Sequence, residues 1–393
     1  MTKYHILVLN QISSHGLHRF PGTRYTVGKA VDHPDAILVR SHDMHEMTIP
    51  ASVKAIGRAG AGTNNIPVAQ MSKRGVPVFN APGANANAVK ELVLAAILLA
   101  ARNVIPALSY VAGLDAGGSD LEDRIEDGKK QFAGAELPHR TLGIVGLGAI
   151  GSLVADTAIK MGMKVIGFDP EITVDAAWRL PSSVRRANSI DELLKQSDFV
   201  TLHVPLLAVT RHLINDERLA AMKPGAVLLN FARDGLVNES ALLAGLRSRR
   251  LKYYLCDFPR AALLHEPGVT ALPHLGASTA EAEENCAVMV VEQVREYLES
   301  GAIVNAVNFP NLEMPRESPY RVAIANANVP NMLGQISTSM AHAGLNIHNM
   351  ANKSRGEMAY TLVDVDSPVQ DAVIAAISAI EGVLSVRAIP QMT

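Results

Sequence analysis

Three glycines and one acid form the pattern with the clearest chemistry in this chain. Gly146, Gly148 and Gly151 are spaced as G-x-G-x-x-G, and Asp169 ends the next apolar run. The first glycine allows a tight turn, the second lets a pyrophosphate approach the backbone, and the third lets helix and strand pack closely. The pattern predicts a dinucleotide site at a helix N-terminus. A carboxylate at position 169 favours NAD, because it accepts bonds from ribose hydroxyls and repels a 2′-phosphate.

Two further side chains have the chemistry to act on a hydroxy acid. Arg233 follows the apolar run 226–230, and His274 follows the run 269–271. In open α/β sheets ligands bind beyond the carboxyl ends of such strands. A guanidinium holds a carboxylate through two charge-assisted bonds, and an imidazole takes up a hydroxyl proton near neutral pH. Each residue alone also fits a plain alternative, a surface arginine after a turn or a histidine bonded within the structure.

Two other segments carry candidate residues. Arg58 lies in the glycine-rich stretch 56–63, where a guanidinium and backbone amides can bind an anion, unless the stretch is only a flexible turn. Asp257 ends a further apolar run and could face the nicotinamide side of the cofactor. Neither cysteine, Cys256 or Cys286, has metal-type spacing, so we expect no metal site.

The order of apolar runs and polar turns predicts three domains. Residues 1–100 with 287–310 alternate short strands and helices, which indicates a discontinuous, flavodoxin-like substrate-binding domain. Residues 101–286 form the NAD-binding Rossmann domain, with an exposed, partly helical arm at 106–130. Residues 306–319 contain three prolines and read as a linker.

Residues 320–393 have their own pattern, in the order strand, helix, strand, strand, helix, strand. The expected fold class is therefore α/β, with two Rossmann-like doubly wound parallel-sheet domains and a C-terminal ferredoxin-like βαββαβ domain.

Composition narrows the class of protein. The chain has 393 residues, a formal net charge of −2, and 48% hydrophobic and 19% charged residues, as in an ordinary globular protein. This balance argues against a nucleic-acid partner. The most apolar stretch, residues 92–101, is too short to span a bilayer, and the N-terminus does not resemble a signal peptide. We expect a cytoplasmic protein without membrane association.

Taken together, these segments resemble the D-isomer-specific 2-hydroxyacid dehydrogenases. The motifs that carry the resemblance are GLGAIG with Asp169, NFARDGLV, CDFP and PHLGAST, in that order. GRAGAGTNNI followed by NAPGANANAVKELV is similar to the branch that oxidises 3-phospho-D-glycerate. Residues 320–393 resemble an ACT domain, an amino-acid-binding module.

The resemblance implies a role for individual residues. Arg233 would orient the carboxylate and the reacting oxygen, His274 would be the acid/base, and Arg58 would meet the substrate phosphate beside Gly60. The implied cofactor contacts are Gly146, Gly148, Ala149, Ile150, Gly151, Asp169, Val204, Pro205, Ala232, Asp257 and Gly276. The positions that would bind an L-serine effector are Asn326, Asn328 and Asn346.

One segment departs from the family pattern. Many members carry a glutamate a few residues after Asp-x-Phe, where it pairs with the histidine, but this chain has Arg260-Ala261-Ala262. Asp257 or Glu266 could replace it, or His274 could act without an acidic partner.

The expected activity is NAD-dependent oxidation of 3-phospho-D-glycerate to 3-phosphohydroxypyruvate, the first step of L-serine biosynthesis, with feedback by L-serine. One alternative is a dehydrogenase or reductase for another 2-hydroxyacid, such as hydroxypyruvate or 2-hydroxyglutarate. Another is a non-catalytic NAD-sensing regulator. The resemblance also implies a homodimer through the cofactor domains, or a homotetramer if the ACT domains pair.

Overall fold

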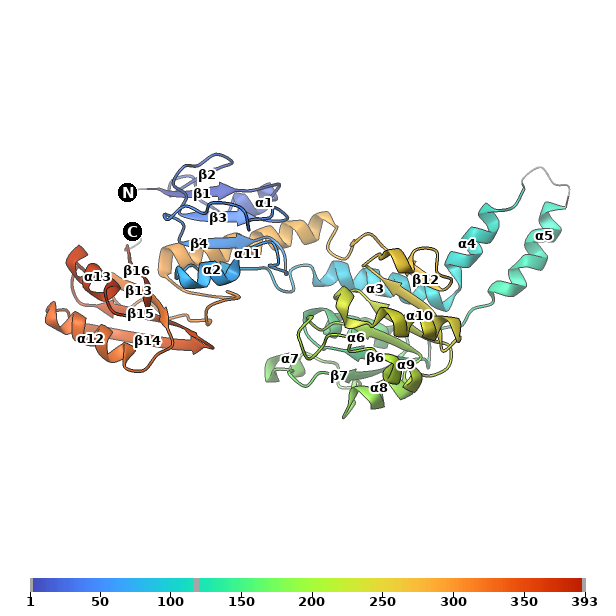
Figure 1. Ribbon diagram of the computed structural model, residues 1–393. Coiled ribbons are helices and arrows are strands. Elements are labelled where there is room, and N and C mark those ends of the chain that lie inside the picture. The colour runs from blue at the N-terminus through green and yellow to red at the C-terminus, as the bar shows by residue number, and fades with distance from the viewer. Residues whose placement is uncertain (1–2, 116–119, 391–393) are drawn as a thin grey trace. The chain divides into compact units, whose positions relative to one another are not determined.

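The computed structural model describes residues 3–115 and 120–390 (Figure 1). It has two compact units. The first comprises Met1–Asn85 with Ala280–Thr393, and the second comprises Ala86–Thr279. The chain therefore passes from one unit to the other twice.

A seven-stranded parallel sheet organises the second unit. Its strands are β6 (Thr141–Val145), β7 (Lys164–Phe168), β8 (Arg185–Arg186), β9 (Phe199–Leu202), β10 (Ala226–Asn230), β11 (Leu251–Cys256) and β12 (Val269–Ala271). They lie in the order β12-β11-β10-β9-β6-β7-β8, and every neighbouring pair is parallel. The strand order reverses between β6 and β9, which is where α/β sheets bind ligands.

Helices cover both faces of this sheet. The helices of the whole second unit are α3 (Ala86–Ala101), α4 (Val104–Ala112), α5 (Leu121–Gly128), η1 (Lys129–Phe132), α6 (Ala149–Lys160), α7 (Val174–Trp178), α8 (Ile190–Gln196), α9 (Asp216–Ala221), η2 (Asp234–Leu236), α10 (Glu239–Arg247) and η3 (Ala261–Leu263). Side chains of α3 and α6 share a core with Leu142 and Ile144 of β6. Those of α8, α9 and α10 share another with Val200 and Leu202 of β9. This doubly wound arrangement confirms the predicted Rossmann-like fold.

The helices α4 and α5 project from the second unit as an arm (Figure 1). The α4 helix buries none of its residues. Between the two helices of the arm, the Tyr110 hydroxyl donates to the Arg124 carbonyl over 2.7 Å, and the Tyr110 ring lies 5.4 Å from that of Phe132. Part of the arm expected at 106–130, residues 116–119, lies outside the described residues.

The first unit begins with a smaller parallel sheet. Its elements are β1 (Tyr4–Val8), α1 (Ser14–Leu17), β2 (Tyr25–Gly28), β3 (Ala36–Val39), β4 (Ala55–Arg58), α2 (Val68–Lys73), β5 (Val78–Phe79) and the long helix α11 (Ala280–Ser300). The strand order is β2-β1-β3-β4-β5. The α11 helix approaches β4 closely because Gly57 has no side chain. A Cβ there would lie 2.7 Å from Val290 and 2.9 Å from Val294.

The C-terminal domain belongs to the same unit. Its elements are β13 (Tyr320–Ala327), α12 (Met332–His342), β14 (Ile347–Arg355), β15 (Met358–Val365), α13 (Asp371–Ser378) and β16 (Val383–Ile389). The antiparallel sheet has the order β14-β15-β13-β16, and α12 and α13 pack on one face of it. This is the predicted ferredoxin-like βαββαβ arrangement.

The other face of the C-terminal sheet closes the core of the preceding domain. Ala323, Tyr360 and Leu362 pack in one cluster with Tyr297 of α11 and with Phe309. The buried Tyr360 hydroxyl donates to the Gly301 carbonyl over 2.7 Å. The two domains of this unit therefore share a hydrophobic core.

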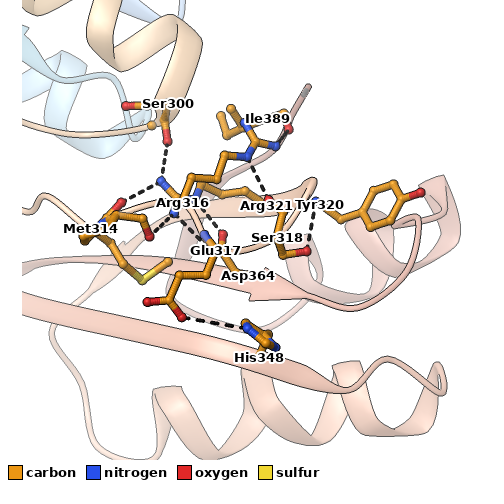
Figure 2. A network of polar contacts seen from close by, with 12 residues as sticks. Ser300, Met314, Arg316, Glu317, Ser318, Tyr320, Arg321, His348, Asp364 and Ile389 are labelled. Carbon is orange, nitrogen blue, oxygen red and sulfur yellow. Dashed lines mark hydrogen bonds and ion pairs between the residues drawn. The ribbon is translucent and has the colours of Figure 1, made fainter. Parts of the chain in front are cut away.

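A buried polar network lies at the same junction (Figure 2). Arg321 on β13 pairs with Asp364 on β15 at 2.6 Å, and their side chains are 1% and 0% exposed. The guanidinium also donates to the carbonyls of Ser300, Met314 and Pro315 over 2.9 to 3.2 Å. One side chain thus joins the C-terminal sheet to the end of α11 and to the connecting segment.

The expected linker is more buried than its composition indicates. Residues 306–319 are irregular, as predicted, but Phe309, Leu312 and Met314 lie in the shared core. An antiparallel bridge also joins Leu312 to Ile303. The segment is therefore a packed part of the first unit and not a free tether.

The domain limits also differ from the sequence expectation. The units change at residues 85/86 and 279/280, not at 100/101 and 286/287. The whole of α3 belongs to the second unit because Val93 and Ile97 pack in its core. The first unit resumes at Ala280, the first residue of α11. Ala282 and Cys286 of this helix are buried, and Cys286 lies in the core of the first unit.

The apolar runs named in the sequence are strands. The run 226–230 is β10, and the run 269–271 is β12. The Asn238 side chain caps α10 by accepting from the Ala241 amide. Among the described residues no single helix is long and apolar enough to cross a membrane. The bent pair α3 and α4 passes that test by length and composition only.

Candidate active site

The glycine turn between β6 and α6 is formed by close backbone approaches. Gly146 has φ +92°, and a Cβ there would lie 2.6 Å from the His203 carbonyl oxygen. At Gly151 a Cβ would lie 2.0 Å from the Gly146 carbonyl oxygen. Neither position can hold a larger residue without moving the backbone, so the first and third glycines have the packing roles that the sequence predicted.

Gly148 differs from the other two, because no atom lies within 4 Å of the position its Cβ would take. It is the N-cap residue of α6, and no side chain caps that end of the helix. The amides of Ala149 and Ile150 open the helix and have no partner within it. This open, positively polarised end fits the pyrophosphate of a dinucleotide.

Asp169 lies directly after β7, next to the glycine turn. Its carboxylate accepts from the Leu147 amide over 2.8 Å and from the Glu171 amide over 3.0 Å. These bonds hold the carboxylate in place, while its remaining lone pairs are available for ribose hydroxyls. The arrangement fits NAD.

The end of β9 forms the opposite side of the turn. The Cγ1 atom of Val204 lies 2.9 Å from the Cβ position of Gly146, so Val204 is in direct contact with the glycine turn. Pro205 follows, and its carbonyl accepts from the Thr210 hydroxyl over 2.6 Å.

His203 is a residue at this turn that the sequence reading missed. Its Nε2 lies 3.0 Å from the Thr201 hydroxyl, and its buried Nδ1 has no partner in the described part of the chain. Burial lowers the pKa of His203 to about 3, so the ring is neutral at physiological pH. Its position at a strand end was the only signal in the sequence.

A buried asparagine holds the turn that carries Arg233. The Oδ1 atom of Asn230 accepts from the amides of Ala232 and Arg233 over 3.3 Å. Its Nδ2 donates to the Arg233 carbonyl over 2.9 Å and to the Tyr254 hydroxyl over 3.3 Å. Asn230 is fully buried, so the backbone of this turn is fixed from inside. The Arg233 guanidinium donates to the Ala232 carbonyl over 2.6 Å, and the residue is exposed.

The loop after β12 carries His274 and is held by Asp257. The buried Asp257 carboxylate accepts from the amides of Leu275 and Gly276 over 2.6 and 2.7 Å. Burial raises the pKa of Asp257, while these amides and the nearby His274 act in the opposite direction. His274 has φ +59°, is exposed, and packs its ring 5.2 Å from the ring of Phe258.

The structure narrows the choice of an acid for His274. Glu266 bonds Arg247 over 3.1 and 3.3 Å. Asp257 directs both oxygens to the backbone of the His274 loop. Within residues 3–115 and 120–390, no carboxylate hydrogen-bonds the His274 ring. Nor do any three histidine, cysteine, aspartate or glutamate side chains gather there as metal ligands.

In the first unit Arg58 ends β4, and its side chain lies over Gly60. A Cβ at Gly60 would lie 2.3 Å from Arg58 Nη1. The Arg58 Nε donates to the Arg40 carbonyl over 3.1 Å. Arg40 itself was missed by the sequence reading, although it directly follows β3. Its guanidinium pairs with Glu283 of α11 at 2.7 Å. Two guanidinium groups thus lie at adjacent strand ends.

The three asparagines of the C-terminal domain are not brought together within one chain. Asn326 is 1% exposed and donates to the Ala327 carbonyl, and Asn328 donates to the Gly356 carbonyl. Asn326 pairs with Ala359 at the start of β15, whereas the Asn346 carbonyl accepts from Asp366, after its end. These two ends are about 23 Å apart at a strand rise of ~3.3 Å per residue.

A doubly wound sheet with a dinucleotide turn at its switch point, and with an arginine and a histidine after two strands at the same edge, defines the class of NAD-dependent dehydrogenases. Residues 94–276 match the family model described as the D-isomer specific 2-hydroxyacid dehydrogenase, NAD binding domain.

Similar proteins with curated names support the match to this family. The chain is 37% identical over 303 residues to the D-3-phosphoglycerate dehydrogenase of Methanocaldococcus jannaschii, covering 75% of this chain and 54% of that protein. It is 33% identical to the D-3-phosphoglycerate dehydrogenase of Haemophilus influenzae, covering 88% and 84%. It is 36% identical to the hydroxypyruvate reductase of Thermotoga maritima, covering 68% and 85%. The chain therefore belongs to the D-isomer-specific 2-hydroxyacid dehydrogenase family. It spans about half the length of the first of these relatives.

A solved structure supports the same fold. The NAD⁺-bound 3-phosphoglycerate dehydrogenase of Entamoeba histolytica matches with a TM-score of 0.60 at 24% identity, covering 79% of this chain and all of that one. NAD is the cofactor of the matched domain.

Proposed function

We propose that this chain oxidises 3-phospho-D-glycerate to 3-phosphohydroxypyruvate with NAD, the first step of L-serine biosynthesis. The observation that carries the proposal is that the glycine turn, Arg233 and His274 all lie at the carboxyl edge of one parallel sheet. Two of the relatives named above are D-3-phosphoglycerate dehydrogenases.

The residues divide the chemistry between them. When bound, NAD would supply the acceptor for the hydride that leaves C2 of the substrate. His274 removes the proton of the C2 hydroxyl, a role suited to an exposed imidazole. Arg233 exchanges its bond to the Ala232 carbonyl for the substrate carboxylate and polarises the C2 oxygen. Gly148 and the first amides of α6 would hold the pyrophosphate of this cofactor, and Asp169 would hold its ribose.

The guanidinium groups of the first unit favour a phosphorylated substrate. Arg58 is fixed over Gly60, and Arg40 lies at the next strand end. The Arg58 guanidinium lies over Gly60 in a glycine-rich turn, where backbone amides can meet the same anion. We assign the substrate phosphate to Arg58 for this reason.

A second candidate reaction is reduction of hydroxypyruvate or oxidation of another 2-hydroxyacid. The similarity to a hydroxypyruvate reductase favours it. The site in the second unit would serve such substrates equally well, because it contacts only the carboxylate and C2 oxygen. A non-catalytic NAD-sensing regulator is disfavoured by the presence of both Arg233 and His274.

Steady-state rates separate these possibilities. We expect NADH formation from 3-phospho-D-glycerate and NAD, with kcat/KM well above that for D-glycerate or D-2-hydroxyglutarate. Preference for an unphosphorylated acid would support the second candidate. Full activity of Arg233→Ala would contradict the proposed mechanism.

We further propose that the C-terminal domain is an ACT domain that binds L-serine and inhibits the enzyme. Asn326 and Asn328 lie at one end of the sheet, and Asn346 lies at the other end. One small amino acid can therefore contact all three only if two copies of the domain pair. The strand β14 is an edge strand, and much of it is exposed, as a pairing surface requires.

Serine binding and serine inhibition are measured separately. Calorimetry should detect binding of L-serine but not D-serine, and millimolar L-serine should lower the rate. Asn346→Ala should weaken both effects, while Ser378→Ala, on the exposed side of α13, should change neither. Absence of binding and of inhibition in the wild-type chain would contradict this proposal.

The arm suggests that the protein forms a homodimer through the second unit. Leu108 and Val111 on α4 are 61% and 57% exposed, which is unusual for one face of an apolar helix. We propose that a second copy of this chain covers these exposed side chains of α4. Pairing of the C-terminal domains would then make a tetramer. Light scattering should give at least a dimer mass, and Leu108→Glu with Val111→Glu should reduce it by half.

We also assign the reaction to the cytoplasm. Cys256 and Cys286 are both free and buried. Free thiols are typical of proteins in a reducing compartment. Fractionation of cells that express the tagged chain tests this assignment.

A further inference from the structure

The strand β11 lies between the two strands that carry Arg233 and His274. In the sheet it pairs with β10 on one side and β12 on the other. The Arg233 turn follows β10, and the His274 loop follows β12. Because neighbouring strands are about 4.8 Å apart, these two loops are separated by roughly 10 Å, and the end of β11 lies between them. Residues 257–260, which follow β11, are called the bracket segment below.

The bracket segment contacts the His274 loop through its first two residues. Asp257 is 1% exposed and accepts from two successive amides of that loop, at Leu275 and Gly276. The Phe258 ring packs against the imidazole at 5.2 Å. A buried carboxylate with two amide donors is a strong anchor, so this loop cannot shift without breaking both bonds.

The last residue of the bracket segment contacts the Arg233 turn. The Arg260 Nε lies 2.8 Å from both oxygens of Asp234, and Nη2 bonds the same carboxylate. Asp234 directly follows Arg233 and starts the short helix η2. The Arg260 Nη1 is also 3.6 Å from Glu239 in the first turn of α10. The sequence places Arg260 where an acid beside His274 was expected, and its side chain is directed to the other loop.

We propose that the bracket segment sets the spacing between Arg233 and His274, and that Arg260 is the positioning residue for Arg233, acting through Asp234. The assignment rests on the proposed roles of Arg233 and His274. Asn230 fixes the same turn from inside, so Arg260 controls the outer half of the turn, where the guanidinium of Arg233 begins.

This role differs from ordinary stabilisation. The side chains of Arg260 and Asp234 are 50% and 39% exposed, and exposed pairs contribute little to folding. Several bonds to one carboxylate nevertheless define its position well. Removal of Arg260 should therefore lower kcat/KM for the substrate while changing the melting temperature little. Small displacements of a group that holds the substrate reduce the reaction rate strongly.

The test uses Arg260→Gln, Arg260→Lys, Asp234→Asn and the Arg260→Gln/Asp234→Asn double variant in the full-length chain. We expect Arg260→Gln to lower kcat/KM for the hydroxy acid by about 3- to 10-fold. The KM for NAD and the melting temperature should stay at wild-type values, and Arg260→Lys should recover part of the loss. The double variant should be no worse than either single variant, because both remove one interaction. Arg247→Gln, which breaks the exposed pair with Glu266 in the same unit, is the matched control and should have wild-type kinetics.

A binding measurement separates this proposal from the proposed function. Oxalate, an unreactive dicarboxylate, is titrated into the NADH complex of each variant by calorimetry. Weaker oxalate binding to Arg260→Gln with unchanged NADH binding supports the positioning role, even if the wild-type chain oxidises no hydroxy acid and the proposed function fails. Wild-type oxalate affinity in Arg260→Gln, or additive losses in the double variant, would overturn the proposal.

Discussion

Arg321 and Asp364 form an ion pair that is almost completely withdrawn from water. Two bonds of 2.6 and 2.9 Å join the groups, and the guanidinium donates to three backbone carbonyls as well. The pair holds the C-terminal sheet to the end of α11 and to the segment at 314–315 (Figure 2). Loss of either partner leaves a buried charge without a counterion.

The first prediction concerns this pair. Asp364→Ala should destabilise the first unit by about 3–5 kcal/mol, the usual cost of an uncompensated buried charge. Replacement of both residues, as in Arg321→Met with Asp364→Leu, should be less harmful than the single change. Amide hydrogen exchange in β13 and β15 measures the effect. Asp156→Ala, which breaks an exposed pair with Lys160, is the control and should cost at most about 0.5 kcal/mol. Equal protection of both strands in Asp364→Ala and in the wild type would refute this view of the pair.

The second prediction concerns pH and His203. Burial lowers the pKa of His203 from 6.5 to about 3, so the unfolded chain binds one proton more than the native chain between these values. Its contribution to stability is therefore present above pH 6.5 and is lost as the pH falls, by up to about 1.4 kcal/mol per pH unit. His203→Gln should remove this part of the acid sensitivity. The urea midpoint of unfolding is measured at pH 7.5 and at pH 5 for both chains. An equal fall in the midpoint of both chains between these pH values would argue against a neutral, buried ring.

The third prediction concerns cofactor choice. Asp169→Ala should raise the KM for NAD by about 10- to 100-fold, because bonds to a charged acceptor are worth ~1.5–3 kcal/mol. The substitution should also reduce the preference for NAD over NADP, because the carboxylate that repels the 2′-phosphate is gone. The neighbouring Glu171 contributes only its amide to this arrangement, so Glu171→Ala is the control. An unchanged ratio of NAD to NADP efficiency in Asp169→Ala would show that another group selects the cofactor.

The fourth prediction concerns the substrate phosphate. Arg58→Ala should raise the KM for 3-phospho-D-glycerate by about 10- to 100-fold, as for a lost charge-assisted bond. The rate with D-glycerate should hardly change. Gly60→Ala should act in the same direction, because its new Cβ would displace the Arg58 guanidinium. Arg19→Gln, which breaks an exposed pair with Glu292 in the same unit, should behave as the wild type. Equal losses for both substrates would point to a structural role for Arg58.

Much of the cofactor site could be predicted because it depends on neighbours in the sequence. The turn from β6 to α6 and the acid after β7 form one continuous segment, and Gly146 and Gly151 make the close backbone approaches that their spacing indicates. The strand-end positions of Arg233 and His274 also follow from apolar runs. Such signals are local, and the sequence displays them directly.

Other features depend on contacts between distant segments and could not be read in this way. Arg260 follows β11 and pairs with Asp234, which follows the neighbouring strand β10. No local sequence pattern marks that pairing. The segment 306–319 has neither a helical nor a strand period, yet it buries Phe309 and Leu312 because the C-terminal sheet covers it. Asn326 was expected as an effector ligand, and its burial depends on the packing around β13.

The most direct test follows the hydrogen itself. The enzyme is mixed with NAD and 3-phospho-D-glycerate deuterated at C2, and the nicotinamide product is analysed by NMR after one turnover. We expect deuterium at C4 of the reduced nicotinamide and an equal amount of 3-phosphohydroxypyruvate, with neither product formed by Arg233→Ala. Reduced cofactor without deuterium, or no reaction under conditions where NAD binds, would contradict hydride transfer from this substrate.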